Sequence, residues 1–277
     1  MRALKTTLLL AALSVLLVLG GEALGGQQGL ILGLGIMGVV NISAYFFSDK
    51  IALRANHAQP VTREQAPRLY AVMERLCGKS GIPMPKLYVT PEQAPNAFAT
   101  GRSPHHASVA VTAGLMQLLN DDELEGVIAH ELSHVRNYDI LITSVAAMLA
   151  GTITFLARMA FWFGGVGGRR GNALASLLML IFAPLGAMLL QLGISRQREY
   201  AADAAGVRLV GHAEGLISAL TKLGEYNKRI PMNVSPTTAS LYIVMPLTFG
   251  GVFKGLFSTH PPLSERIAVL RNMTVLR

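Results

Sequence analysis

Four long apolar stretches alternate with more polar segments along the chain. They run from Thr6 to about Gly20, Gly29 to Phe47, Ile140 to about Phe163, and Ala173 to Ile194. A helix that crosses a lipid bilayer needs roughly 20 apolar residues, with some tolerance. The last three stretches meet that length, so each of them predicts a membrane-spanning helix.

The first stretch is shorter and allows two interpretations. It follows a basic start at Arg2 and Lys5, and Ala23-Leu24-Gly25 would serve as a signal-peptide cleavage site. Only residues 21–28 separate it from the second stretch, and this close spacing favours a retained helix. We therefore predict four spans.

The polar segment between the second and third stretches, residues 48–139, has mixed patterns that predict an α+β domain. Thr62 to Lys79 has helical periodicity, with Thr62 and Gln65 in capping-box spacing. Pro67 would have to lie near the first turn, so the helix could also begin later. Lys86–Thr90 and Ala107–Thr112 are short β-like runs bounded by glycine and proline. Together they predict a small β-sheet covered by helices.

Helix signals also appear before the third apolar stretch and after the fourth. Asn120 predicts a helix start, because Glu123 three residues later completes a capping box. Glu199–Val210 and Ala213–Leu223 have helical patterns. Residues 241–253 are apolar but too short for a span, which favours a core or membrane-surface segment.

Composition supports membrane insertion. Hydrophobic residues make up 51% of the chain and charged residues only 14%, against a usual charged share of about 25%. The net charge of +8 would suit a nucleic-acid partner, but no aromatic-plus-basic motif is present, so we expect none. The single cysteine, Cys77, excludes an intrachain disulfide and is typical of a buried structural residue.

The basic residues predict an orientation for the four spans. Two arginines, Arg169 and Arg170, fall in the second outer loop and oppose the trend. The inner side is far more basic, which places both termini and the polar domain in the cytoplasm. The basic residues on that side are Arg2, Lys5, Lys50, Arg54, Arg136, Arg196 and Arg198.

Candidate chemistry begins with His130-Glu131-Leu132-Ser133-His134, an H-E-x-x-H motif on a predicted helix. Residues i and i+4 lie on the same helical face, so both imidazoles can reach one zinc ion while Glu131 handles a proton. The pattern is only moderately specific, because two unrelated histidines on an exposed helix would also satisfy it.

A catalytic zinc ion needs a third protein ligand and an open position, and Glu199 is the candidate. The two predicted spans between His134 and Glu199 return the chain to its starting side, so the three ligands share one compartment. Asp203, one turn after Glu199, could accept the ring N–H of a ligand histidine. Asp139 could do the same or simply end a helix, and Glu199 and Asp203 could also be surface charges.

At these residues the chain resembles the HtpX-type heat-shock metalloproteases, relatives of the CAAX prenyl endopeptidases in the gluzincin group. The resemblance covers essentially the whole chain, and the order of the motifs matches as well. Besides His130–His134, it rests on Pro95–Gly101, Arg198–Asp203 and Ser258–Arg266.

The resemblance implies roles for individual residues. His130, His134 and Glu199 would bind one Zn²⁺ per chain, with Glu131 as catalytic base and Asp203 as supporting acid. The segment containing Asn96, Ala97, Phe98 and Ala99 would form a substrate-binding edge strand. His260 and Arg266 match positions that approach the substrate carbonyl in the CAAX-protease relatives, although His260 could be a turn residue before two prolines and Arg266 a helix-surface charge. His260 is the first candidate for stabilising the oxyanion and Tyr200 the second.

We thus expect a mainly α, integral membrane protein with about four transmembrane helices and an α+β zincin-like catalytic domain with a small sheet. Its parts would be two N-terminal spans (1–47), the H-E-x-x-H half of the domain (48–139), a transmembrane hairpin (140–194) and the Glu199 half (195–277).

The resemblance implies a multi-pass endopeptidase of the bacterial inner membrane whose substrates are chiefly misfolded membrane proteins on the cytoplasmic side. A non-catalytic membrane chaperone or scaffold, and a CAAX-type processing protease, remain alternatives.

Overall fold

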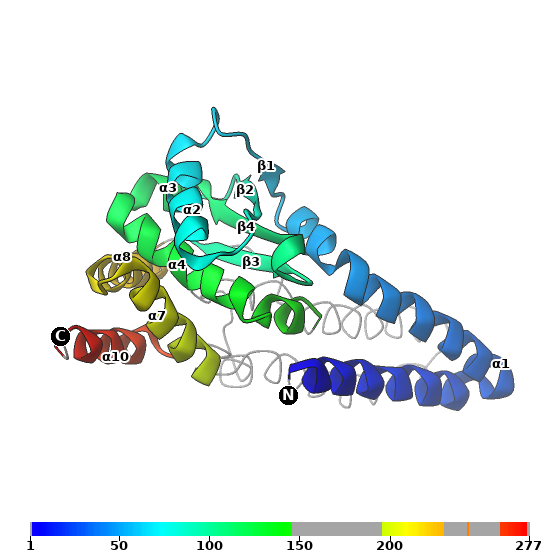
Figure 1. Cartoon of the computed structure of the whole chain (residues 1–277). Coiled ribbons are helices and arrows are strands. Elements are labelled where there is room, and N and C mark those ends of the chain that lie inside the picture. The colour runs from blue at the N-terminus through cyan, green and yellow to red at the C-terminus, as the bar shows by residue number, and fades with distance from the viewer. Residues whose placement is uncertain (1, 146–195, 230–242, 244–260, 276–277) are drawn as a thin grey trace. The chain divides into compact units, whose positions relative to one another are not determined.

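The computed structural model describes residues 2–145, 196–229, 243 and 261–275 (Figure 1). Contacts divide the chain into two compact units, with one boundary between Ser48 and Asp49; the second unit comprises Asp49–Ser144 and Ile194–Arg277. The fourth predicted span, and the third beyond residue 145, lie outside the described residues.

The first two apolar stretches both fall within α1 (Arg2–Ala55), whose backbone departs from helical geometry at Gly26 (φ 58°, ψ −141°). Glycine tolerates this positive φ because it lacks a Cβ atom. Within the described residues, no single helix has the length and apolarity of a membrane span. The pair Gly26–Val40 and Tyr45–Ala55, bent by 72°, meets that test jointly, by length and composition alone.

A four-stranded mixed sheet forms the scaffold of the second unit. β2 and β4 have the bounds that the sequence predicts, whereas β1 has no counterpart among the predictions. The strand order is β1-β2-β4-β3, in which β2 and β4 are parallel and the other pairs antiparallel. β3 therefore forms one edge of the sheet. The strands are β1 (Gln59–Pro60), β2 (Lys86–Thr90), β3 (Ala97–Gly101) and β4 (Ala107–Thr112).

Helix α2 (Pro67–Ser80) begins later than Thr62. The expected Thr62–Gln65 contact is present, with the Thr62 N–H donating to Gln65 Oε1 at 2.9 Å, but it closes a turn that precedes the helix. Pro67 lies at the first helical position, where its missing N–H costs nothing. The α2 face toward the core consists of Leu69, Val72, Met73, Leu76 and Cys77.

The central helix of this unit is α4 (Asp121–Arg136), which packs against α2 and β3 as well as α7 and α8. The predicted capping box is confirmed: the Asn120 side chain accepts from the Glu123 N–H, and Glu123 Oε2 accepts from the Asn120 N–H, both at 2.9 Å. A short helix that the sequence did not indicate, α3 (Ala113–Leu118), precedes α4.

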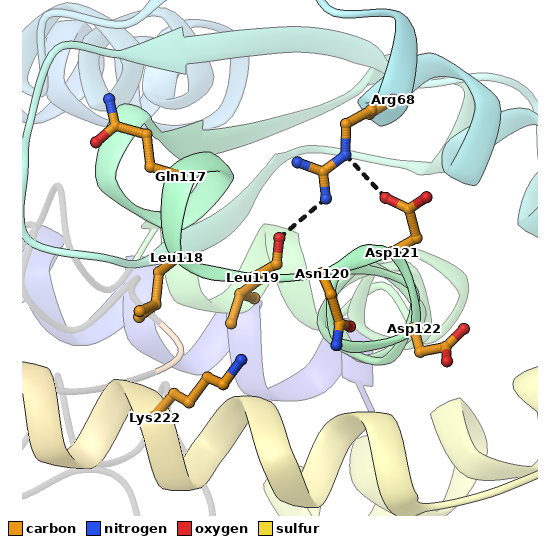
Figure 2. A pocket seen from close by; sticks show the side chains of 8 residues that line it. All are labelled: Arg68, Gln117, Leu118, Leu119, Asn120, Asp121, Asp122 and Lys222. Atoms are coloured by element: carbon orange, nitrogen blue, oxygen red, sulfur yellow. Dashed lines mark hydrogen bonds and ion pairs between the residues drawn. The ribbon is translucent and has the colours of Figure 1, made fainter.

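Arg68 of α2 holds the turn between α3 and α4. Its guanidinium donates to Asp121 Oδ1 (2.8 Å) and to the carbonyl oxygens of Met116 (3.1 Å) and Leu119 (2.9 Å). Arg68, Leu119 and Asp121 line a shallow hollow at the start of α4, together with Lys222 of α8 (Figure 2). The hollow therefore lies beside paired charges that position the first turn of α4.

The remaining helices are α7 (Arg196–Val210), α8 (Glu214–Arg229) and α10 (Leu263–Val275). α8 continues past the predicted end at Leu223. Gly224 lies inside this helix, and a Cβ atom there would lie 2.9 Å from Leu263 Cδ1. α10 packs against α7 and α8 and was not predicted. Of the apolar residues 241–253, only Ile243 is described.

Candidate metal centre

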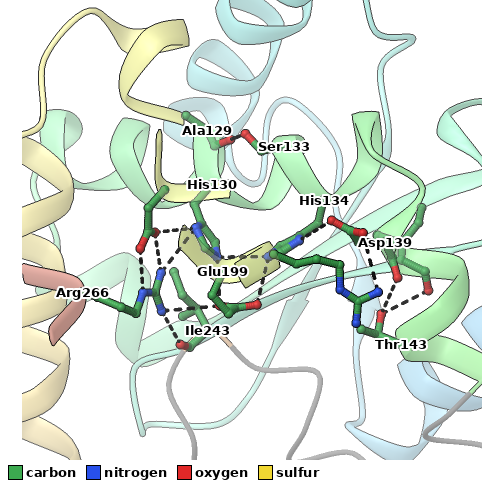
Figure 3. Close-up of polar contacts among 12 residues, drawn as sticks. Ala129, His130, Ser133, His134, Asp139, Thr143, Glu199, Ile243 and Arg266 are labelled. Atoms are coloured by element: carbon green, nitrogen blue, oxygen red, sulfur yellow. Dashed lines mark hydrogen bonds and ion pairs between the residues drawn. The ribbon is translucent and has the colours of Figure 1, made fainter. Parts of the chain in front are cut away.

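Helix α4 carries His130 and His134 on one face, and α7 brings Glu199 against them (Figure 3). The Nε2 atoms of the two histidines are 3.2 Å apart. Glu199 Oε2 lies 3.7 Å from His130 Nε2, and Glu199 Oε1 lies 3.4 Å from His134 Nε2. One ligand atom from each residue thus falls within 4.8 Å of the other two, which is a possible metal site.

The second ring nitrogen of His130 faces Asp203. Nδ1 lies 2.8 Å from Asp203 Oδ1, so the ring donates its Nδ1–H to the carboxylate and keeps the Nε2 lone pair toward Glu199. Arg266 donates to the same carboxylate through Nε (2.9 Å) and Nη2 (2.6 Å). Burial raises the pKa of Asp203, but the charge of Arg266 and the contacts with His130 and Arg266 outweigh it and lower the pKa to about 2.

His134 has a matching partner in Asp139, whose Oδ2 lies 3.3 Å from Nδ1. The chain reaches this position through Tyr138, which adopts a left-handed conformation (φ 58°) directly after α4. Burial lowers the pKa of His134, but the hydrogen bonds to Asp139 and Glu199 and the charges of Glu199 and Glu131 raise it to about 10. The negative field that favours a proton on this ring also favours a metal cation beside it.

Glu131 is buried, with 3% of its surface exposed. Burial raises the pKa of its carboxyl group, and the charges of His130 and His134 act in the opposite direction without cancelling the effect. A carboxyl group whose pKa lies above its ordinary value can accept and return a proton nearer neutral pH.

Glu199 reaches α4 because α7 packs very close to it. At Gly206, one side of α7 meets the backbone of α4: a Cβ atom there would lie 3.2 Å from the His130 nitrogen and 3.3 Å from the Ala129 carbonyl carbon. Ala202, one turn earlier, is fully buried. Small residues at these positions allow the close approach that brings the third carboxylate to the histidines.

Two of the expected substrate or oxyanion residues contact other side chains of the protein, and one of them, Arg266, lies 3.7 Å from Glu199 Oε2. The Tyr200 hydroxyl donates to Glu265 Oε2 (3.0 Å), which links α7 to α10. Arg266, expected to contact substrate, has no exposed surface, and it is bound to Asp203. His260 lies outside the described residues.

The expected edge-strand residues do lie on β3, with Ala97, Phe98 and Ala99 inside the strand and Asn96 just before it. Sequence reasoning missed Ile243. Its carbonyl oxygen accepts from Arg266 Nη1 at 3.1 Å, and its N–H donates to the Ala97 carbonyl oxygen at 3.0 Å. No local pattern marks this residue, because both contacts join backbone atoms to segments far away in the chain.

Comparison with known proteins decides the family. Residues 63–274 match the sequence profile of Peptidase family M48, and this range contains every residue of the site. The chain belongs to peptidase family M48. The M48 peptidase is 50% identical over 275 residues to a protease HtpX homolog of Desulforapulum autotrophicum. The alignment covers 97% of this chain and 89% of the relative. A protease HtpX homolog of Syntrophotalea carbinolica is 50% identical and is covered completely, as is this chain.

These relatives confirm the resemblance to HtpX-type proteases, and with it the prediction of a metalloendopeptidase. Among solved structures, the M48 peptidase is similar to the crystal structure of S. mikatae Ste24p, with a TM-score of 0.53 at 22% identity. The match covers 97% of this chain but 65% of the Ste24p chain. At this identity the likeness concerns the fold alone, and the M48 peptidase is the shorter chain.

Proposed function

We propose that this M48 peptidase is a zinc-dependent endopeptidase, anchored in the bacterial inner membrane, that cleaves misfolded or damaged membrane proteins on the cytoplasmic side. The observation that carries the proposal is the convergence of His130, His134 and Glu199 from two helices. Their roles as ligands of one Zn²⁺ ion per chain follow from the type and spacing of the donor atoms.

The donor set fits zinc. Two nitrogen or oxygen atoms at about 2.0–2.1 Å from a tetrahedral zinc ion lie roughly 3.3 Å apart, and the three distances here are 3.2, 3.4 and 3.7 Å. Within the described part of the chain, no fourth histidine, cysteine or acidic residue joins the group. Three protein ligands are typical of a catalytic site that keeps a position open, which favours an enzyme over a scaffold with a closed structural metal.

The surrounding residues have complementary tasks. When bound, zinc supplies Lewis acidity, which lowers the pKa of a water molecule and polarises the scissile carbonyl. Glu131 would take the proton of the attacking water and pass it to the leaving amine. Asp203 and Asp139 would hold the rings of His130 and His134 in the orientation needed for binding through Nε2.

His260 and Arg266 would have different tasks. His260 is our candidate donor to the developing oxyanion, because the Tyr200 hydroxyl is used by Glu265 in this structure. Burial of Arg266 and its two bonds to Asp203 support a role in positioning that carboxylate rather than in contacting substrate.

The edge strand β3 would bind the peptide. An extended segment can add to an exposed sheet edge through main-chain hydrogen bonds, which depend little on side chains. Broad specificity for unfolded segments follows, as a protease of damaged proteins needs. The expected residues Asn96 to Ala99 lie on or just before this strand, and its unpaired main-chain groups would bind the peptide.

Membrane anchoring is supported by the apolar stretches and their basic flanks. Large apolar side chains that a bilayer would cover are exposed along the second half of α1. They are Ile31, Leu32, Leu34, Ile36, Val39, Ile42, Tyr45, Phe46 and Phe47. We propose two spans within residues 1–47 and a hairpin at 140–194, which separates the two catalytic segments 48–139 and 195–277.

The test compares the full chain, purified in detergent, with its Glu131→Gln variant. We expect the wild type to hold one zinc ion and cleave an unfolded model protein, and the variant to retain zinc but lose activity by about 10²–10⁴-fold. Wild-type cleavage by the variant would remove the assignment of the base. Cleavage of a prenylated peptide but not of the unfolded protein would instead favour a CAAX-type processing protease, and a zinc-loaded wild type that cleaves neither would favour the scaffold.

A further inference from the structure

Alternate residues of β3 direct their backbone groups toward β4 or toward the open edge of the sheet. The Asn96 carbonyl oxygen accepts from the Thr112 N–H at 2.9 Å, so Asn96 and residues of the same parity face β4. The residues of opposite parity direct their N–H and C=O groups outward, where an added strand would pair. They are Ala97, Ala99 and Gly101.

The outward groups of Ala97 are both taken. Its N–H donates to Asn96 Oδ1 at 3.1 Å, and its carbonyl oxygen accepts from the Ile243 N–H at 3.0 Å. Ala99, two residues further, makes no outward backbone hydrogen bond to any residue that the structure describes. Among the described residues, the outer edge of β3 is therefore paired at Ala97 and unpaired at Ala99, which is 5% exposed.

Ile243 is held firmly at this position. Its carbonyl oxygen accepts from Arg266 Nη1 at 3.1 Å, and only 2% of the residue is exposed (Figure 3). Arg266 itself is fully buried and is bound twice to Asp203. Displacing Ile243 would take away the carbonyl acceptor of a buried Arg266 N–H, which is unfavourable. Ile243 is thus held in place at the edge of β3, and a peptide would not displace it; we call this residue the wall.

We infer that Ile243 determines substrate register by ending the peptide-binding edge of β3 at Ala97. This inference rests on the proposed function, in which the peptide pairs with β3. The first outward backbone groups that no described residue already pairs are those of Ala99, and these would bind the peptide first. Arg266 connects the wall to Asp203, and Asp203 contacts His130, so the end of the edge has a constant relationship to the metal-binding residues. Peptide residues beyond the wall gain no main-chain pairing.

Peptides of increasing length test this inference. Two series are extended, one residue at a time, on either side of the scissile bond, and kcat/KM is measured for the full-length enzyme in detergent. We expect kcat/KM to reach a plateau sooner on the side that meets Ile243. Ile243→Pro lacks the N–H and frees the Ala97 carbonyl, so that plateau should move out by about two residues, the repeat of outward groups along a strand. The change should appear in KM, with little effect on kcat.

Ile243→Ala is the matched control, because it removes most of the side chain but keeps the N–H, and its plateau should not move. A folded, zinc-loaded Ile243→Pro with the wild-type plateau would overturn the inference, as would an equal shift in Ile243→Ala. If wild-type kcat/KM were independent of length on both sides, peptide addition to β3 would itself be wrong, and the proposed function would need revision.

Hydrogen exchange gives a second measurement that does not require the proline variant to fold or the enzyme to turn over. In Glu131→Gln, the Ile243 amide should exchange slowly both with and without a bound model peptide. Faster exchange on peptide binding would show that substrate displaces Ile243, and the wall would be refuted. Unchanged protection, together with slower exchange at Ala99, would support it.

Discussion

His130 Nδ1 lies 2.8 Å from Asp203 Oδ1, and the same carboxylate accepts two hydrogen bonds from Arg266. A histidine of α4 is thereby oriented by a residue of α7, which is fixed in turn by a residue of α10. All three side chains are buried, so the arrangement depends on hydrogen bonds that solvent water cannot replace. This chain of contacts makes the geometry of the metal site sensitive to changes outside the three candidate ligands.

Asp203→Asn should weaken metal binding and stability together. The amide nitrogen is a donor and cannot accept the hydrogen bonds that His130 and Arg266 give to the carboxylate, and Arg266 loses its counter-charge in a buried position. We expect zinc affinity to fall about 10–100-fold, and the free energy of unfolding to fall by about 3–5 kcal/mol. Competition with a chromophoric chelator and denaturant unfolding measure the two effects.

Glu265→Gln is the control for that variant, because Glu265 joins the same two helices through the exposed Tyr200 hydroxyl. Its loss should cost about 1 kcal/mol or less, and zinc affinity should not change. Unaltered zinc affinity in folded Asp203→Asn would contradict the orienting role of Asp203.

Gly206→Ala should disturb the contact between α7 and α4. The new methyl group would lie 3.2 Å from the His130 nitrogen, which forces the helices apart. Overpacking of this kind costs about 1–3 kcal/mol, and the shift of Glu199 should lower zinc affinity. Gly78→Ala, in α2 with no atom within 4 Å of the new Cβ, should instead stabilise by about 1 kcal/mol. Equal melting-temperature increases in both variants would contradict the close approach.

The ionisation of Glu123 should make the free energy of unfolding depend on pH. Burial raises its pKa, but hydrogen bonds from Lys222 and Ser218 and from the Asn120 backbone outweigh burial, so the pKa in the folded state is lowered. A lowered pKa contributes stability that is present above the unfolded-state pKa and lost as pH falls through the folded-state pKa.

Denaturant unfolding, repeated as the pH is lowered from 6 into the acid range, should therefore show a loss of stability. This loss should be smaller in Glu123→Gln than in the wild type. Asp122→Asn controls for removing a charge from the same helical turn, since Asp122 is exposed. The same acid dependence in Glu123→Gln and the wild type would exclude this source.

Cys77 should resist alkylation in the folded protein. Burial, together with the charge of Glu74, raises the pKa of the thiol to about 11, so at pH 8 about one thiol in a thousand is ionised, and the thiolate is the reactive form. Iodoacetamide should add no mass to the native protein over minutes, and it should label the protein fully in denaturant. Cys77→Ser supplies the unlabelled reference, and rapid native labelling would show that the site is open.

Several features of the fold follow from residues close together in the chain, and these were predictable. The Asn120–Glu123 capping box and the bounds of β2 and β4 are examples. The sequence left the beginning of α2 open, because the Thr62–Gln65 spacing also suits an isolated turn, and the structure begins the helix at Pro67. α8 extends past its predicted end, and Gly224 lies inside the helix, close to Leu263, instead of ending it.

The sequence by itself determined the family, the type of chemistry and the placement of two histidines on one helical face, since the helix repeat alone aligns residues four positions apart. Only the tertiary structure decided that Glu199 lies at those rings, that Arg266 is buried against Asp203, and that Ile243 closes the edge of β3. Those contacts join segments separated by long stretches of chain, and their geometry depends on how closely α7, α10 and the sheet pack, which no local pattern encodes.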